Sequence, residues 1–273
     1  MLEDVKEGLS NDGFYLINSF FDVESEIVPI QKSIHELSIQ VAKRHNIPVT
    51  VTDFNPETFD EVYIKILNLD RKIASEVYDL VKQLPPFLRL ICGKKSEDLF
   101  CALRDTDSPG IGAGSYGIRI DNPSEEKFQS HWHQEFFYQP QSIDGIVFWT
   151  PLINIDQRIG PVKILPKSHK AGLCNYAKTY QNKSGAYQFG IHQEDEIIKK
   201  YDQKQPLPKP GDLLLMDFLT IHSSGDNISE RSRWSIQYRF FNHKEPIGAK
   251  IGWKSSVTLG TDIARVFPEN FKE

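Results

Sequence analysis

Several features that would place a chain in a particular class are scarce or missing among these 273 residues. No apolar run approaches the length of a membrane-spanning helix. Basic residues are not in excess, because the net charge is −5, and this balance argues against a nucleic-acid-binding surface. The charged first residues, 1–7, lack the apolar stretch of a secretion signal. We therefore expect a cytoplasmic protein without nucleic-acid or membrane partners.

Cysteine is also scarce. Cys92, Cys101 and Cys174 have neither the spacing of a zinc site nor the even count of a disulfide framework, so reduced thiols are expected. Internal repeats and low-complexity segments are missing too. What remains, with 39% apolar and 25% charged residues, is the composition of a soluble globular protein. No linker divides the chain, and we expect a single domain over residues 1–273.

The first part of the chain, about residues 1–97, is predicted to be a helical flank. A short strand at 13–17 precedes apolar residues at helical spacing from Asp22 to Arg44, with Asp22 or Ser25 as the cap. A second helix is expected from Arg71 to Leu84, where two prolines follow. These helices are expected to pack on the outside of a sheet.

From about residue 98 to residue 243 the pattern changes to short apolar runs separated by Gly, Pro, Asp and Asn. Many short strands at this spacing predict an all-β sandwich or barrel, and hence a mainly β protein with flanking N-terminal helices. The expected strands are Phe100–Arg104, Ser115–Ile120, His131–Gln139, Gly145–Ile155, Val162–Leu165, Ala186–Ile191, Asp212–Asp217 and Arg233–Asn242. A short helix is expected at 194–201.

The stretch 130–138, Ser-His-Trp-His-Gln-Glu-Phe-Phe-Tyr, carries the most specific chemical signal. On a strand, residues two apart point to the same face, so His133 and Glu135 would share one. A distant second histidine would complete a 2-His-1-carboxylate triad, which is diagnostic of non-haem Fe(II) oxygenases. The same spacing recurs at His192 and Glu194, so spacing alone does not decide between the two triplets.

The expected second histidine is His222, which follows a nearly continuous apolar strand and precedes a polar turn. Three candidate strands separate it from His133, as the two metal strands of a jelly roll require, whereas little more than a loop separates it from His192. The triplet at 133 is therefore favoured. His169 follows a turn signal and is interpreted as loop. The remaining candidates, His35, His45 and His243, are expected at the surface.

The alternating run 233–240 predicts a half-buried strand with a polar face made of Arg233, Ser235, Gln237 and Arg239. We expect this strand to form a hairpin with the one that carries His222. There Arg233 is able to make a two-pronged pair with a ligand carboxylate. The alternative, a surface arginine on an edge strand, is equally compatible with the spacing.

Taken together, the chain resembles the phytanoyl-CoA dioxygenase (PhyH) family of Fe(II)/2-oxoglutarate oxygenases. The motifs that carry the resemblance are Asp12-Gly13-Phe14-Tyr15, Trp132-His133-Gln134-Glu135, Phe148-Trp149-Thr150-Pro151-Leu152, Gly160-Pro161 followed by Pro166-Lys167-Ser168-His169-Lys170, and Gly211-Asp212-Leu213 followed by His222, Ser224 and Arg233. Their order and spacing are specific together, and they cover nearly the whole chain.

The resemblance implies a double-stranded β-helix (a cupin-like jelly roll) with iron held by His133, Glu135 and His222. It implies 2-oxoglutarate and O2 as co-substrates, with the far carboxylate of 2-oxoglutarate on Arg233 and Ser224. Positions that line the co-substrate pocket in relatives are matched by Ser130 and Trp149, and Arg119 is a further candidate for contact with co-substrate or substrate. One departure is that Glu135 replaces the commoner aspartate, so the longer side chain must fold back.

The implied reaction is hydroxylation of a C–H bond of a small-molecule substrate, with release of succinate and CO2. The segments Thr50–Tyr63 and Cys174–Gln193 are expected to cover the site, and polar and aromatic residues in the second favour a polar metabolite such as a sugar, an amino-acid-like compound or a natural-product intermediate. Two alternatives stay open: a non-catalytic jelly-roll binding module, and desaturation or epimerisation at the same iron centre. The sequence does not determine the oligomeric state.

Overall fold

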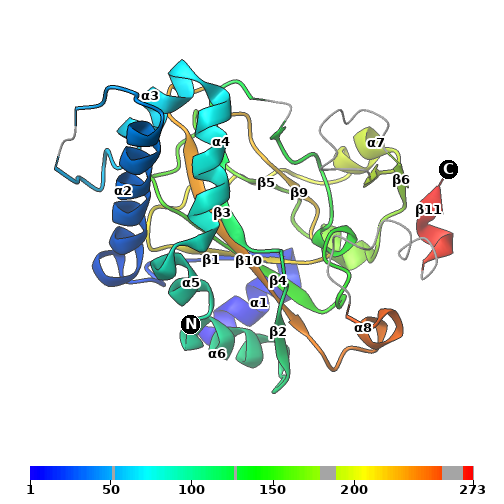
Figure 1. The fold of residues 1–273 in the computed structure, drawn as a ribbon. Helices are drawn as coiled ribbons and strands as arrows, with labels where there is room; N and C mark the ends of the chain where they lie inside the picture. The colour runs from blue at the N-terminus through cyan, green and yellow to red at the C-terminus, as the bar shows by residue number, and fades with distance from the viewer. Residues whose placement is uncertain (51–52, 126–127, 179–188, 254–266, 273) are drawn as a thin grey trace.

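The structure is a computed structural model that describes residues 1–50, 53–125, 128–178, 189–253 and 267–272 (Figure 1). Its helices and helical turns are α1 (Leu2–Asp12), the π-helix η1 (Val23–Ile27), α2 (Val28–Arg44), α3 (Glu61–Leu69), α4 (Arg71–Leu80), η2 (Val81–Gln83), α5 (Pro85–Ile91), α6 (Lys94–Arg104), η4 (Glu135–Phe137), η5 (Ser168–Ala171), α7 (Glu194–Ile198), α8 (Pro246–Ile251) and η7 (Pro268–Asn270). None of the helices in these ranges is long and apolar enough to cross a lipid bilayer.

The strands are β1 (Phe14–Ile17), β2 (Pro109–Ile111), β3 (Gly117–Asp121), β4 (Gly145–Pro151), β5 (Lys163–Ile164), β6 (Tyr176–Lys178), β7 (Phe189–Ile191), β8 (Leu213–Asp217), β9 (His222–Ser223), β10 (Arg233–Asn242) and β11 (Phe271–Lys272). Six of them form the main sheet in the order β1-β8-β4-β10-β2, with β3 also paired to β10. Two smaller sheets are β5-β9 and β11-β6-β7. Sheets with N-terminal helices beside them are the architecture expected from the sequence.

Helices form at both N-terminal stretches where the sequence predicts them, 22–44 and 71–84, and the N-terminal helices cover one face of the main sheet (Figure 1). The helix expected from Asp22 is present as η1 and α2, and the Asp22 side chain accepts a hydrogen bond from the backbone N–H of Ser25 at its start. On the sheet, Trp234 of β10 packs against Tyr63 of α3, and the Tyr238 hydroxyl lies 2.8 Å from Ser96 Oγ of α6. One face of β10 is therefore buried under helices, and its other face is free to line a site.

Two of the expected elements are wrong, and the expectations also omit a helix. Residues 100–104 belong to helix α6, because a short apolar run has no period that separates helix from strand, and Leu99, Phe100 and Leu103 suit a helix equally well. The expected strand at 131–139 is a single bridge at His133 followed by the turn η4. Helix α3, at 61–69, was not predicted at all.

Two expectations about placement are also wrong. The polar strand β10 pairs with β4, β3 and β2, whereas His222 lies on β9, which pairs with β5, so the two do not form a hairpin. His35 was expected at the surface but is 5% exposed on the inner face of α2. In both cases the pairing and the burial depend on long-range packing that a local pattern does not contain.

Candidate metal centre

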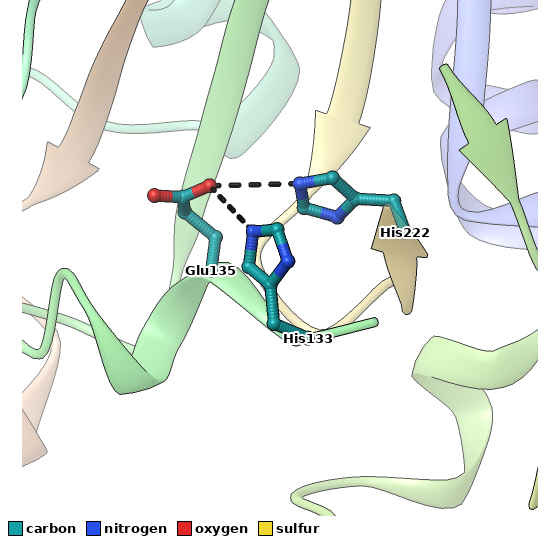
Figure 2. A group of neighbouring side chains, drawn as sticks. All are labelled: His133, Glu135 and His222. Atoms are coloured by element: carbon teal, nitrogen blue, oxygen red, sulfur yellow. Dashed lines mark ion pairs between the residues drawn. The ribbon is translucent and has the colours of Figure 1, made fainter. Parts of the chain in front are cut away.

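His133, Glu135 and His222 converge in the interior, and their potential ligand atoms all lie within 4.8 Å of one another (Figure 2). The Oε2 atom of Glu135 is 3.9 Å from Nε2 of His133 and 3.6 Å from Nε2 of His222. These separations are too long for direct hydrogen bonds, but two atoms that each lie roughly 2 Å from one ion are separated by at most about 4 Å. The donor set and its spacing therefore suit a single metal ion.

Backbone pairing brings the two histidines together. His133 and His222 form an isolated antiparallel bridge in which each backbone N–H donates to the other's carbonyl oxygen at 3.0 Å. Directly opposite residues of an antiparallel pair place their side chains on the same side. The imidazole ring centroids are accordingly 4.3 Å apart.

Glu135 joins them although no regular strand runs through the motif. Gln134 has an extended backbone, with φ −100° and ψ 137°, so alternation of sides holds locally between His133 and Glu135. The buried Gln134 side chain points the other way, where its amide donates to the carbonyl oxygens of Gly172 and Leu219. Glu135 then opens the turn η4. His133 and Glu135 therefore point to the same side as expected, although the backbone there is a short extended segment followed by a turn.

Each histidine is oriented by its second ring nitrogen. Nδ1 of His133 lies 2.7 Å from the His131 carbonyl oxygen, and Nδ1 of His222 lies 2.9 Å from the Thr220 carbonyl oxygen. A carbonyl oxygen only accepts, so each Nδ1 carries the proton and donates. This tautomer leaves the Nε2 lone pair of both rings directed at the shared space, as metal ligation requires.

A buried arginine holds the carboxylate. Arg239 Nε donates to Glu135 Oε1 at 3.0 Å, and its Nη2 lies 3.3 Å from Oε2. Burial alone would raise the pKa of Glu135, but Arg239 and the two histidines outweigh it and hold that pKa well below its usual range. Burial and the neighbouring His222 lower the pKa of His133. An ionised carboxylate beside a neutral imidazole is the protonation state that binds metal.

The other histidines do not join this group. His192 directly follows β7, where its backbone N–H donates to the Asn175 carbonyl oxygen, while Glu194 begins α7. His169 points its Nε2 at the Ser10 carbonyl oxygen, 3.1 Å away, near the N-terminus. Within the described ranges, the group at 133, 135 and 222 is the one cluster of three metal-ligating side chains.

The group forms part of the wall of a cavity of about 330 Å³, and every residue expected to bind co-substrate lines the same cavity: Arg119, Ser130, Trp149, Ser224 and Arg233. Arg233 is 1% exposed, which excludes the alternative of a surface arginine. Its Nη2 donates to Asp121 at 2.7 Å and its Nη1 to the Gly160 carbonyl oxygen, while Nε is buried with no hydrogen-bond partner among the described residues.

Arg119, Ser130 and Ser224 form a hydrogen-bonded group beside Arg233. Arg119 Nη1 donates to Ser130 Oγ at 2.8 Å, and the Ser224 backbone N–H donates to the Ser130 carbonyl oxygen at 3.0 Å. Asp121 accepts from both Arg119 and Arg233. Burial alone would raise the pKa of Asp121, but the two guanidinium groups lower it to about 2. The carboxylate is therefore ionised and keeps both arginines in place.

Two residues of this centre were not predicted. Arg239 was identified only as one member of the polar face of 233–240, and Asp121 was not singled out. The alternation that placed Arg233 on that face also places Arg239 there, so the position was available from the pattern. The pairing of Arg239 with Glu135 could not be read from the pattern, because the two residues are 104 positions apart in the chain.

Of the two segments expected to cover the site, the described end of the first packs elsewhere and the second is only partly described. Phe59 and Tyr63 are buried against Trp234, which projects from β10 on the side opposite Arg233, so this part of Thr50–Tyr63 packs away from the cavity. Residues 179–188 of the segment Cys174–Gln193 lie outside the described residues. Tyr176, in the described part of this segment, packs on Phe137, the last residue of the turn η4.

Comparison with known proteins agrees with this site. The phytanoyl-CoA dioxygenase (PhyH) family matches residues 9–235. The curated protein "Phytanoyl-CoA dioxygenase, peroxisomal" from Mus musculus is 27% identical over 136 residues, which are 46% of this chain and 38% of the mouse protein. The matched part thus spans well under half the length of that relative.

Solved structures show the same fold at low sequence identity. EctD from S. alaskensis, in its apo form, is 18% identical with a TM-score of 0.57, over 87% of this chain and 75% of EctD. The epimerase SnoN in complex with Fe3+, alpha ketoglutarate and nogalamycin RO is 13% identical with a TM-score of 0.55, over 96% and 92% of the two chains. AviO1 from Streptomyces viridochromogenes Tue57 is 14% identical with a TM-score of 0.56, over 90% and 97%.

Proposed function

The chain belongs to the phytanoyl-CoA dioxygenase (PhyH) family of Fe(II)- and 2-oxoglutarate-dependent oxygenases, and on this basis we propose that it hydroxylates a C–H bond of a small polar metabolite. The observation that carries the proposal is the convergence of two imidazole Nε2 atoms and one carboxylate oxygen inside a cavity. The family expected from the sequence is confirmed.

His133, Glu135 and His222 would hold the iron. Three protein ligands leave positions open for 2-oxoglutarate and O2, unlike a structural zinc site, which is closed by four. With Fe(II) bound, O2 would be the oxidant: one of its oxygen atoms would enter the substrate C–H bond and the other would enter succinate, as 2-oxoglutarate is oxidised and releases CO2. The protein supplies the ionised Glu135, the fixed imidazole tautomers and the cavity in which they meet.

Arg233 would bind the far carboxylate of 2-oxoglutarate. Its buried Nε has no partner among the described residues, and a charge-assisted bond to a ligand carboxylate would satisfy it. Ser224 and Ser130 lie beside it with hydroxyl groups, Arg119 holds Ser130 in position, and Trp149 contributes an apolar wall. These roles make the predicted co-substrate residues one continuous subsite.

Three further parts of the proposal concern the whole chain. The main sheet and the small sheet that carries His222 are proposed to be the two halves of a jelly roll, which the similarity to EctD and SnoN supports. Residues 1–273 are proposed to form one domain. The location expected from the sequence, the cytoplasm, stays a prediction.

The test is the anaerobic addition of Fe(II) and 2-oxoglutarate, followed by O2. An oxygenase gives a weak visible charge-transfer band and then releases succinate, whereas a non-catalytic binding module gives neither. The mass of the product then decides the reaction outcome. A gain of one oxygen atom is expected for hydroxylation, and a product without it would indicate desaturation or epimerisation instead.

A further inference from the structure

A lysine and an amide lie on the same face at one end of the cavity. Lys82, on η2, and Gln237, on β10, both line the cavity, and Gly117 of β3 lies between them. Gly117 and Gln237 are directly opposite in the β3–β10 pair, so their side-chain directions lie on the same face. A Cβ at Gly117 would lie 3.8 Å from Cε of Lys82, so Lys82 covers the same face.

Within the described part of the chain, neither the half-buried Lys82 ammonium nor the half-buried Gln237 NH2 group donates a hydrogen bond to a protein acceptor. Gln237 accepts from Arg239 Nη2 through its Oε1 at 3.2 Å, which turns its NH2 group away from Arg239, and no partner of that NH2 lies among the described residues. The Lys82 ammonium lies 4.3 Å from the centre of the Tyr78 ring, with no carboxylate within 4.0 Å in the described residues. Tyr78 is 38% exposed, so this end faces solvent.

The three arginines of the cavity share two carboxylates. Arg239 faces Glu135, and Asp121 lies between Arg119 and Arg233. Fe(II) and the 2-oxoglutarate dianion cancel each other in formal charge, so with both bound the cavity keeps an excess of positive charge to which Lys82 contributes. This positive charge is not a reflection of overall composition, because the chain carries a net charge of −5. A cavity of opposite sign to the molecule attracts an anion selectively.

We propose that the substrate carries an anionic group, a carboxylate or a phosphate, that binds between Lys82 Nζ and Gln237 Nε2. The inference rests on the proposed function and adds a substrate class to it. Such a group accepts one charge-assisted and one neutral hydrogen bond, which satisfies both donors. Arg239 contacts both Glu135 and Gln237, so the position of the Gln237 amide is tied to a metal ligand, and an anion bound there would fix which end of a substrate faces the iron.

Small fluorinated anions test the proposal directly. The wild-type protein, loaded anaerobically with Co(II) and excess 2-oxoglutarate, is titrated with trifluoroacetate or monofluorophosphate, and fluorine relaxation caused by Co(II) is measured. Only a probe inside the cavity is relaxed strongly and saturably. We expect saturation by one of the two anions, which distinguishes carboxylate from phosphate, and none by neutral trifluoroethanol.

Variants locate the anion. Lys82→Gln is expected to raise the half-saturating concentration at least about tenfold, and Lys82→Glu further, because a charged hydrogen bond is lost. Lys72→Gln, the same change at an exposed position of α4, should behave as wild type. Equal binding in Lys82→Gln, no saturation by either anion, or saturation by trifluoroethanol would overturn the inference. The Co(II) spectrum and retained 2-oxoglutarate are read on the same samples, and failure to load them would overturn the proposed function as well.

Discussion

At the scale of single residues, each metal-ligating side chain uses one polar atom for the metal and has its other polar atom held by a hydrogen bond. Each histidine is fixed through Nδ1, and Glu135 is fixed through Oε1 by Arg239, so Oε2 is the oxygen that faces both imidazoles. Glutamate in place of the commoner aspartate fits this arrangement, because the longer side chain reaches between Arg239 and the histidines. Such outer contacts typically change metal affinity by about 10–100-fold when removed.

Removal of either histidine should abolish iron binding. His133→Ala and His222→Ala each delete one of three ligands, so we expect no iron after anaerobic reconstitution and no succinate release. His192→Ala, from the second His-x-Glu triplet, should keep wild-type iron content. Iron per chain measures the outcome. Retention of iron in His133→Ala with loss in His192→Ala would reverse the assignment of the triplet.

Arg239→Ala should weaken Fe(II) binding by about 10-fold or more, because Glu135 loses the contact that orients it and becomes a buried charge without its strongest partner. Titration with Fe(II) or Co(II) under nitrogen measures the affinity. The matched control is Arg158→Ala, an exposed arginine outside the cavity, which should bind metal as wild type does. An unchanged metal affinity in Arg239→Ala would show that the contact does not position the ligand.

Arg233→Ala should instead raise the requirement for 2-oxoglutarate by roughly 10-fold or more while metal binding persists. The reason is that a buried, charge-assisted pair is lost, whereas exposed arginines contribute little. Titration of 2-oxoglutarate into each metal-loaded variant measures it, again with Arg158→Ala as control. Wild-type affinity for 2-oxoglutarate in Arg233→Ala would remove this residue from the co-substrate site.

At the scale of elements, β10 is the shared support. One of its faces carries Arg233, Gln237 and Arg239 into the cavity, and the other carries Trp234, Ile236 and Tyr238 under the helices. Asp60, just before α3, ties this helix to the strand: it accepts from Trp234 Nε1 at 2.9 Å and from Arg231 Nη2 at 3.0 Å. Packing of the helical flank therefore sets the position of the catalytic face.

Asp60→Ala should lower the free energy of unfolding by about 2–4 kcal/mol, because it leaves the buried Trp234 N–H without an acceptor and removes the partner of Arg231. Asp79→Ala, at an exposed position of α4, should change it by less than about 0.5 kcal/mol. Urea denaturation of the metal-free proteins compares them. Equal stability of the two variants would mean that Asp60 does not connect α3 to β10.

At the scale of the whole molecule, the buried Asp121 couples stability to pH. Its pKa of about 2 lies below the value of 3.8 expected in the unfolded chain. The folded state therefore holds the ionised form more tightly, and the stabilisation is present above about pH 4 and is lost as pH falls towards 2. A difference of this size corresponds to roughly 2 kcal/mol.

Asp121→Asn should remove this pH-dependent part of the stability. We expect the wild-type free energy of unfolding to fall more steeply between about pH 4 and pH 2 than that of the variant, since asparagine does not titrate. Denaturation at a series of pH values measures the slopes. Parallel curves for the two proteins would mean that other carboxylates carry the acid sensitivity.

The amino-acid sequence by itself determined which side chains are available for a metal centre and a co-substrate site. Residue types and their order located the three members of the metal centre and the five co-substrate candidates, because ligand identity and motif spacing are written in the chain. It also determined several elements, including the strand at 13–17, the helix from Asp22 and the alternating run at 233–240, which the structure contains as β1, η1 with α2, and β10.

Only the tertiary structure decided how these parts meet. It showed that His133 and His222 are joined by a backbone bridge, that a turn delivers Glu135, and that Arg239 holds it from a strand 104 residues away. It also placed Lys82 of a helical turn beside Gln237 of β10. Local periodicity reports the burial of neighbouring residues, whereas these contacts depend on which strands pair and which helices pack, and long-range pairing leaves no signature in a short window of sequence.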